Sequence, residues 1–199
     1  MPLRNTRARY GAVAMTFHWI IAALIVTNVC LGFYFGDFVS KSDPAFFTLV
    51  QTHKSIGLTV LSLSVLRLLW RLVNPVPLLP TDMNPALGFV AHATHWLFYF
   101  LIIAIPLAGW AMVSSSPLGT PTMYFGQFQW PHLPFLAALP RAEKTHYVVV
   151  FRETHNLLAF SVIGLLALHV MGALWHQMFR HDNVLRRMVP FTSVGETAT

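Results

Sequence analysis

Residues 152–169 read RETHNLLAFSVIGLLALH, an apolar run with a histidine near each end. His155 and His169 are 14 residues apart, which is just under four helical turns, so both rings leave nearly the same helix face. At about 1.5 Å per residue they lie roughly 21 Å apart along the axis, and a bilayer's hydrocarbon core is about 30 Å thick. One predicted helix therefore presents two imidazoles, a common kind of metal ligand, one near each membrane surface.

The composition is that of a membrane protein. Of the 199 residues, 55% are hydrophobic and only 10% are charged, whereas a soluble domain carries about 25% charged residues. The 13 Lys and Arg exceed the 7 Asp and Glu, an excess typical of cytoplasmic loops in membrane proteins. A nucleic acid is not an expected partner, because the sequence has no basic patch on a soluble face.

Four apolar runs are long enough to span a bilayer, and they cover about 14–36, 46–72, 88–113 and 152–179. The second and third are separated by an extended loop with Pro75, Pro77, Pro80 and Pro85. Residues 114–145 form the longest connection, which we expect to lie against the outer surface with a short helix. The sequence thus predicts an all-α membrane protein, a single domain over 1–199 built as a bundle of four transmembrane helices.

The basic residues predict its orientation, with both termini in the cytoplasm. In this topology eight arginines are cytoplasmic and five basic residues are on the outer side. The bias follows the positive-inside rule. The cytoplasmic set is Arg4, Arg7, Arg9, Arg67, Arg71, Arg180, Arg186 and Arg187, and the outer set is Lys41, Lys54, Arg141, Lys144 and Arg152.

Four histidines fall into two pairs at matched depths. His18 and His169 lie near the cytoplasmic side, on the first and fourth helices, and His53 and His155 lie near the outer side, on the second and fourth. Haem ligated by two imidazoles needs one ring from each of two facing helices, which is how bundles build such sites. Structural zinc needs four ligands, more than each depth offers. Because the chain lacks a C-x-x-C-H signature, we predict haem b rather than covalently attached haem.

Other residues are candidates to surround a haem. Gly57 and Gly164 offer close approach to the backbone, or else close helix packing. Arg67 lies 14 residues after His53, at a depth where haem propionates would emerge, and a buried arginine is costly without such a partner. Arg71, Lys54 and Arg152 are interpreted as interfacial residues that extend towards the membrane surface.

Several motifs together resemble one family: RYG at 9–11, FHW at 17–19, HKSIG at 53–57, VLRLLWR at 65–71, His92 and His95, His155 and His169, and His176 with DNVLRRM at 182–188. They are similar to those of the bacterial cytochrome b561 family, dihaem b proteins with four helices in the inner membrane. The resemblance covers nearly the whole chain. It implies that His18, His53, His155 and His169 ligate two haem irons.

The resemblance also implies electron exchange with ubiquinone, and one kind of member oxidises superoxide. It suggests a quinone site at His176 with His95 or His92, since histidine offers hydrogen bonds and titrates near neutral pH. An interfacial position against lipid headgroups is an equal alternative for these three rings. The remaining His132, His146 and His181 are expected in solvent.

The predicted function is transmembrane electron transfer in a bacterial respiratory chain, between the quinone pool and a periplasmic partner. Two alternatives stay open. One is a superoxide oxidase that passes electrons to ubiquinone, with the outer basic residues steering the anion to the outer haem. The other is a histidine-based protein that binds or transports metal ions, although the apolar interior lacks the carboxylates that such pathways often use.

Overall fold

The computed structural model describes residues 2–78, 84–180 and 184–190. Part of the predicted proline loop, including Pro80, lies outside the described residues. So do His181 and the first two residues of the predicted DNVLRRM motif.

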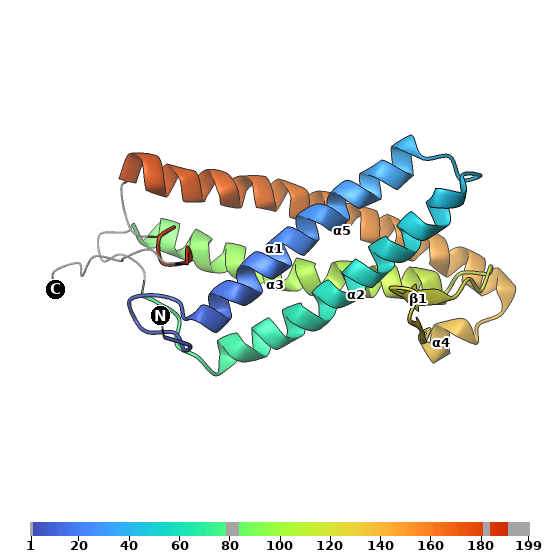
Figure 1. The fold of residues 1–199 in the computed structure, drawn as a ribbon, viewed down its shortest axis with the longest axis horizontal. Helices are drawn as coiled ribbons and strands as arrows, with labels where there is room; N and C mark the ends of the chain where they lie inside the picture. The colour runs from blue at the N-terminus through green and yellow to red at the C-terminus, as the bar shows by residue number, and fades with distance from the viewer. Residues whose placement is uncertain (1, 79–83, 181–183, 191–199) are drawn as a thin grey trace.

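Among the described residues, four helices are long and apolar enough to cross a membrane (Figure 1). They are α1 (Ala12–Phe33), α2 (Pro44–Leu72), α3 (Pro85–Ser114) and α5 (Arg141–Trp175). Two of them continue into π-helical turns, η1 (Tyr34–Phe38) after α1 and η2 (His176–Arg180) after α5. The short helix α4 (Pro134–Ala137) precedes α5. The predicted helical membrane bundle is confirmed.

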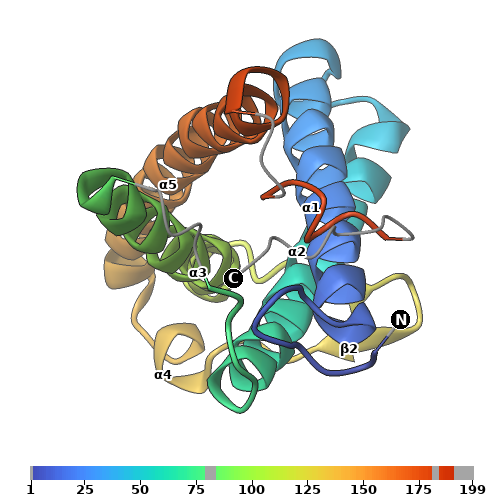
Figure 2. The ribbon, with the colours of Figure 1, turned by 90° about the vertical axis from the view of Figure 1, so that its left-hand side faces the viewer.

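The four helices form two facing pairs. α1 packs on α2, α3 packs on α5, and α2 joins the pairs by packing on α3. In the end-on view of Figure 2, α1 and α2 lie on one side and α3 and α5 lie on the other. The first and last described segments meet at the same end, where the indole of Trp19 donates a hydrogen bond to the Met188 carbonyl at 2.9 Å. Side chains on α1 or α2 can therefore face side chains on α5.

The starts of α2 and α3 are set by caps just outside the apolar runs. The Asp43 carboxylate accepts a hydrogen bond from the amide of Ala45 at 2.8 Å, and Pro44 is the first helical residue. Asn84 caps α3 in the same way, before Pro85. Proline fits the first helical position because its missing N–H would have no intrahelical partner there. The predicted starts at 46 and 88 were slightly late, because they were read from hydropathy.

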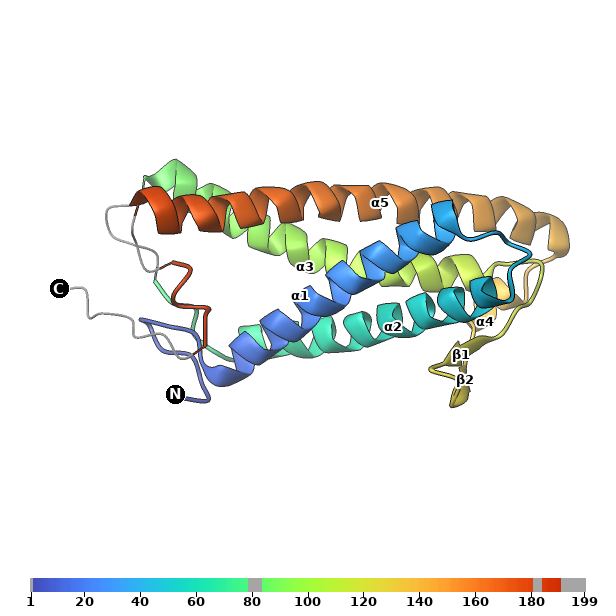
Figure 3. The same ribbon diagram turned by 45° about the horizontal axis from the view of Figure 1, so that its top comes forward.

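The fourth spanning helix is much longer than predicted. α5 begins at Arg141, after Pro140, and not at 152. Its 35 residues extend about 52 Å at 1.5 Å per residue, well beyond the roughly 30 Å of hydrocarbon. Figure 3 shows one end of α5 projecting past the neighbouring helices. The prediction was wrong because residues 141–151 are partly polar, and a hydropathy pattern marks the membrane boundary rather than the end of the helix.

The long connection holds a β-hairpin that the sequence analysis did not predict. Strands β1 (Thr122–Tyr124) and β2 (Phe128–Trp130) pair antiparallel. Gly126, at φ +73°, supplies the left-handed conformation that the turn needs. Gln51 of α2 binds the hairpin, since its side-chain amide donates to the Pro121 carbonyl at 2.8 Å and accepts from the Met123 amide at 3.1 Å. The predicted short helix in this connection is present as α4.

Candidate functional site

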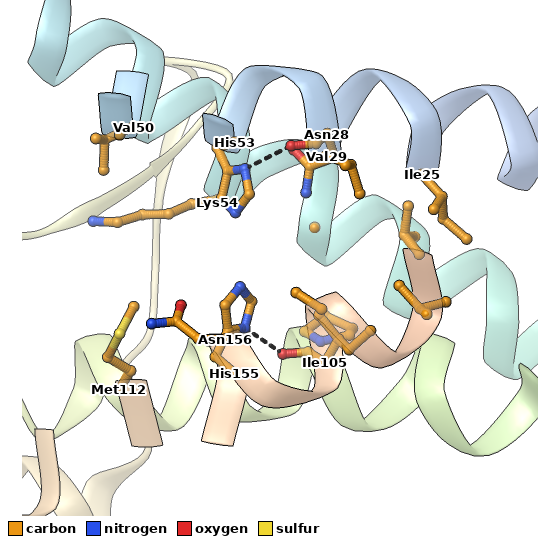
Figure 4. A pocket seen from close by; sticks show the side chains of 18 of the residues that line it. Ile25, Asn28, Val29, Val50, His53, Lys54, Ile105, Met112, His155 and Asn156 are labelled. Atoms are coloured by element: carbon orange, nitrogen blue, oxygen red, sulfur yellow. Dashed lines mark hydrogen bonds between the residues drawn. The ribbon is translucent and has the colours of Figure 1, made fainter. Parts of the chain in front are cut away.

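The outer histidines face one another across the two helix pairs. His53 projects from α2 and His155 from α5, with ring centres 6.2 Å apart and ring planes at 72° (Figure 4). Each ring is oriented by a backbone carbonyl from a neighbouring helix. Nδ1 of His53 lies 3.2 Å from the backbone carbonyl oxygen of Asn28, and Nδ1 of His155 lies 2.9 Å from that of Ile105.

These carbonyls determine the tautomer of both rings. A carbonyl only accepts, so each Nδ1 carries the proton and donates it. Nε2 of the neutral ring then keeps its lone pair, which is the form that binds a metal.

A cavity of about 580 Å³ surrounds the outer pair. This volume lies within the roughly 300–1,000 Å³ typical of cofactor pockets. The lining is mainly apolar, with glycines at Gly32, Gly36, Gly57 and Gly109 and cationic side chains at Lys54 and Arg152.

Two of these glycines leave room for the histidine rings. A Cβ added at Gly109 would lie 3.2 Å from two atoms of the His155 ring, and one added at Gly32 would lie 3.4 Å from the His53 ring. Gly57 lines the same cavity, but a Cβ there would meet only the Asn28 amide at 3.7 Å. At Gly164 a Cβ would meet nothing within 4 Å, so the close helix packing considered for it is not found.

Sequence reasoning missed Asn28, Gly32 and the role of Gly109. One signal was available for the first two: they are four residues apart on α1, and therefore share a face.

The inner histidines form a second facing pair. His18 on α1 and His169 on α5 have ring centres 6.3 Å apart and ring planes at 60°. Aromatic edges flank both rings, with Trp19 at 5.2 Å from His18 and Phe98 at 5.2 Å from His169. The structure therefore brings together the same two pairs that the sequence predicts.

His95 is a third ring at the inner end. Its centre lies 6.2 Å from that of His169, as close as the centre of His18. Its Nδ1 donates to the Ala91 carbonyl at 2.6 Å, one turn earlier on α3. The sequence suggests His95 as a quinone residue and gives no sign of this contact with His169.

The ring spacings match ligation of one metal ion from opposite sides. An imidazole nitrogen bonds a metal such as zinc at about 2.0–2.1 Å and lies about 1.1 Å from its ring centre, so two opposed rings have centres about 6.2–6.4 Å apart. The outer and inner pairs, at 6.2 and 6.3 Å, both fit. The angle between ring planes is free in such a site, because each ring can rotate about its bond to the metal.

Arg67 makes His18 different from the outer histidines. Its Nη2 donates to Nδ1 of His18 at 3.1 Å, and its guanidinium lies over the Tyr99 ring at 5.6 Å. A guanidinium has no acceptor, so Nδ1 of His18 must accept. In the neutral ring the proton is then on Nε2, and binding of a metal through Nε2 requires Arg67 to release Nδ1 or Nε2 to give up its proton.

The other two quinone candidates are His176 and His92. His176 begins η2, with its ring 5.1 Å from that of Trp175, and His92 is exposed, with Nδ1 donating to the Gly88 carbonyl at 2.8 Å. His132, expected in solvent, is only partly exposed, and its Nε2 is buried with no hydrogen-bond partner in the part of the chain that the structure describes. Burial, and then the positive charge of Lys54, lower the pKa of the His132 ring.

Comparisons with known proteins identify the family of this chain. The prokaryotic cytochrome b561 family matches residues 9–191. Cytochrome b561 homolog 2 of Escherichia coli (strain K12) is 31% identical over 95% of each chain. A probable superoxide oxidase CybB of Yersinia pestis is 27% identical over 92% of this chain and 96% of its own. A cytochrome b562 of Cereibacter sphaeroides is 28% identical over 90% and 94%.

The match extends over nearly the whole chain, and one relative exceeds 30% identity over almost its full length. The family implies haem b, electron transfer and a bacterial membrane. With its membrane-spanning helices and facing histidines, this chain belongs to the prokaryotic cytochrome b561 family.

Proposed function

We propose that the chain binds two haems b, one between His53 and His155 and the other between His18 and His169, and carries electrons across the bacterial inner membrane. The observation that carries the proposal is the spacing of the two facing pairs, 6.2 and 6.3 Å between ring centres. A haem held by two imidazoles supplies a one-electron iron couple with no open coordination position, so it favours outer-sphere electron transfer.

A site for a bare metal ion is less well supported. Within residues 2–78, 84–180 and 184–190, no group of three or more His, Cys, Asp or Glu side chains could hold a metal ion. The two imidazoles of a pair would hold the iron of a haem, and the porphyrin would supply the remaining four nitrogen ligands. The donor set therefore favours haem over a transported ion.

The chain's own residues orient the ligands and exclude water. The Asn28 and Ile105 carbonyls hold the outer rings through Nδ1, and such outer contacts fix ring orientation in metal sites. Phe35 packs against His53 in a T-shaped contact with ring centres 5.3 Å apart, and Phe98 makes the same kind of contact with His169 at 5.2 Å. A largely apolar lining limits solvent and so helps to set the reduction potential.

The choice of His18 over His95 as the inner partner rests on the helix arrangement. His95 is on α3, which packs directly on α5, the helix of His169. His18 is on α1, in the opposite pair of helices, as His53 is at the outer site. A flat macrocycle fits between facing pairs better than between two helices already in contact.

The two sites would form an electron path along α5. His155 and His169 are separated by 14 residues, about 21 Å along the axis. We propose ubiquinone as the partner at the arginine-rich inner end and a periplasmic redox protein at the outer end. Among His176, His95 and His92, the first two are the preferred quinone residues.

The test of electron transfer is reduction by a quinol. Short-chain ubiquinol is mixed rapidly with the oxidised, haem-loaded chain, and the absorbance of reduced haem is followed. We expect reduction in wild type, slower reduction in His176→Phe and an unchanged rate in the control His146→Phe, which lies on the outer part of α5. No reduction of a two-haem wild type by any quinol would contradict the proposed partner.

A second function, superoxide oxidation, is favoured by one observation. Lys54 and Arg152 line the outer cavity, where they would attract an anion, and a relative carries the name of a probable superoxide oxidase. Asp37 lines the same cavity, so the local charge is mixed. Superoxide consumption faster than spontaneous dismutation, coupled to quinone reduction, would establish this activity. A rate equal to that of spontaneous dismutation would contradict superoxide oxidation, and electron carriage would be the one remaining function.

A further inference from the structure

A second, smaller cavity lies at the inner ends of α2 and α3, against the N-terminal segment. Its volume is about 30 Å³, and one water molecule needs about 10–15 Å³. The space therefore admits a small polar group. The side chains with polar atoms in its lining are those of Asn5, Tyr10, Arg67, Trp70, Arg71, His95 and Tyr99.

Two cations share this cavity without an acidic partner in the described lining. The guanidinium groups of Arg67 and Arg71 both lie 5.6 Å from the centre of the Tyr99 ring. They are four residues apart on α2, a spacing at which like charges destabilise a helix. The acidic residues that the structure describes are on η1, before α2 and on the first part of α5, at the opposite end of the bundle.

Hydrogen-bond donors predominate around the same space. The buried indole nitrogen of Trp70 has no hydrogen-bond partner among the residues that the structure describes, and an indole N–H can only donate. Each guanidinium also offers only donors. Asn5 is already engaged, because its amide donates to the Pro75 carbonyl at 2.9 Å and accepts from the Gly11 amide at 2.9 Å. The described lining therefore offers cations and donors, and its neutral acceptors, such as the Tyr99 hydroxyl, carry no negative charge to balance them.

We propose that this cavity is an oxyanion site, in which Arg67, Arg71 and the indole N–H of Trp70 bind a carboxylate or phosphate oxygen. Arg71 is one residue from the end of α2, so the site lies at the depth of the membrane interface. Basic pockets between helices at this level bind phosphate headgroups of acidic lipids.

Two sources supply this chemistry. One is the phosphate of an acidic phospholipid. The other is a propionate of the inner haem, and only this second source rests on the function proposed above. Arg67 links the site to the inner histidines, because it also donates to Nδ1 of His18. An oxyanion that engages Arg67 would weaken that bond and favour the His18 tautomer with a free Nε2.

The test compares Arg71→Gln and Trp70→Phe with wild type and with Arg180→Gln, a control that also removes an inner arginine but does not line the cavity. Full-length, haem-loaded protein is purified in a neutral detergent. Retention of added phosphatidylglycerol is measured by native mass spectrometry, and the midpoint potential of each haem by redox titration. Thermal unfolding in detergent identifies any variant that is misfolded.

If the oxyanion is a lipid phosphate, both cavity variants should retain about tenfold less phosphatidylglycerol than wild type and Arg180→Gln do. A lost hydrogen bond to a charged group has about this effect on affinity. If it is a propionate, lipid retention is unchanged. The inner haem potential then falls in Arg71→Gln, because loss of a positive charge favours oxidised iron. Cavity variants that match wild type in both measurements would overturn the proposal. Lipid retention is read independently of the haem signal, so it distinguishes failure of this site from failure of the proposed haem ligation.

Discussion

Gly109 is the residue at which space for the outer ligand is most restricted. A methyl group there would lie 3.2 Å from Cε1 and Nδ1 of His155, closer than nine in ten real contacts of a Cβ. We therefore predict that Gly109→Ala displaces the ring and removes most of the outer haem, because close-packed interiors do not absorb such shifts freely. Haem content per chain and the reduced-minus-oxidised spectrum measure the effect.

Gly164→Ala is the matched control, because its added Cβ meets nothing within 4 Å. It should keep both haems and gain slightly in helix stability. Equal haem content in the two alanine variants would contradict the role given to Gly109.

A second prediction separates His18 from His95, whose rings are equally close to His169. His18→Ala should abolish the inner haem, whereas His95→Ala should retain it with an altered midpoint potential. Haemochrome assays and redox titrations distinguish the two variants. The reverse result would assign the inner ligand to α3 and would require the haem to lie beside the contact between α3 and α5.

The HKSIG motif shows what a local sequence can and cannot specify. The structure gives separate positions to its residues: His53, Lys54 and Gly57 line the outer cavity, while Ile56 joins the core with Ile21 and Val60. Ser55 faces the hairpin. Helical spacing predicted the depth of His53, but partners from other parts of the chain, such as the Asn28 carbonyl, could not be predicted from spacing alone.

At the scale of elements, Ser55 attaches the hairpin to α2. Its hydroxyl accepts from the Phe125 amide at 2.9 Å and approaches the carbonyls of Gln51 and Met123 at 2.8 and 3.2 Å. Ser55→Ala leaves the Phe125 amide without this acceptor, a loss that costs about 1–3 kcal/mol. We predict a lower unfolding temperature in detergent and faster chymotrypsin cleavage in residues 124–130.

Ser62→Ala is the control on the same helix, since that hydroxyl donates to the Leu58 carbonyl of its own helix. It should behave like wild type in both measurements. If Ser55→Ala is as stable and as protease-resistant as Ser62→Ala, the hairpin is held by other contacts, such as those of Gln51.

The spanning helices were predictable as elements because a bilayer demands long apolar runs. Their ends were less predictable. α2 and α3 begin at caps that lie outside the apolar runs, and α5 begins about eleven residues before the predicted start. The hairpin was missed because its three-residue strands depend on hydrogen bonds to α2 rather than on a pattern of their own.

At the scale of the whole molecule, the distribution of arginines predicts the orientation. Of the basic residues, the eight assigned to the inner end are all arginine, and the described acidic residues lie towards the other end. The positive-inside rule then predicts that both termini are in the cytoplasm. A green fluorescent protein fused after Thr199 should fluoresce, and alkaline phosphatase inserted after Gly126 should be active. An alkaline phosphatase fused at the C-terminus should be inactive. If it were active, the orientation would be the opposite one, and the inner and outer sites would be exchanged.

The central claim is that two facing histidine pairs bind two haems. The most direct test is the number of haems per chain, measured by a pyridine haemochrome assay. Wild type should contain two haems b, and His155→Ala and His169→Ala should each contain roughly one, with different remaining spectra because each variant loses a different site. One haem in wild type, or a well-folded His155→Ala that still holds two, would contradict the assignment of the ligands.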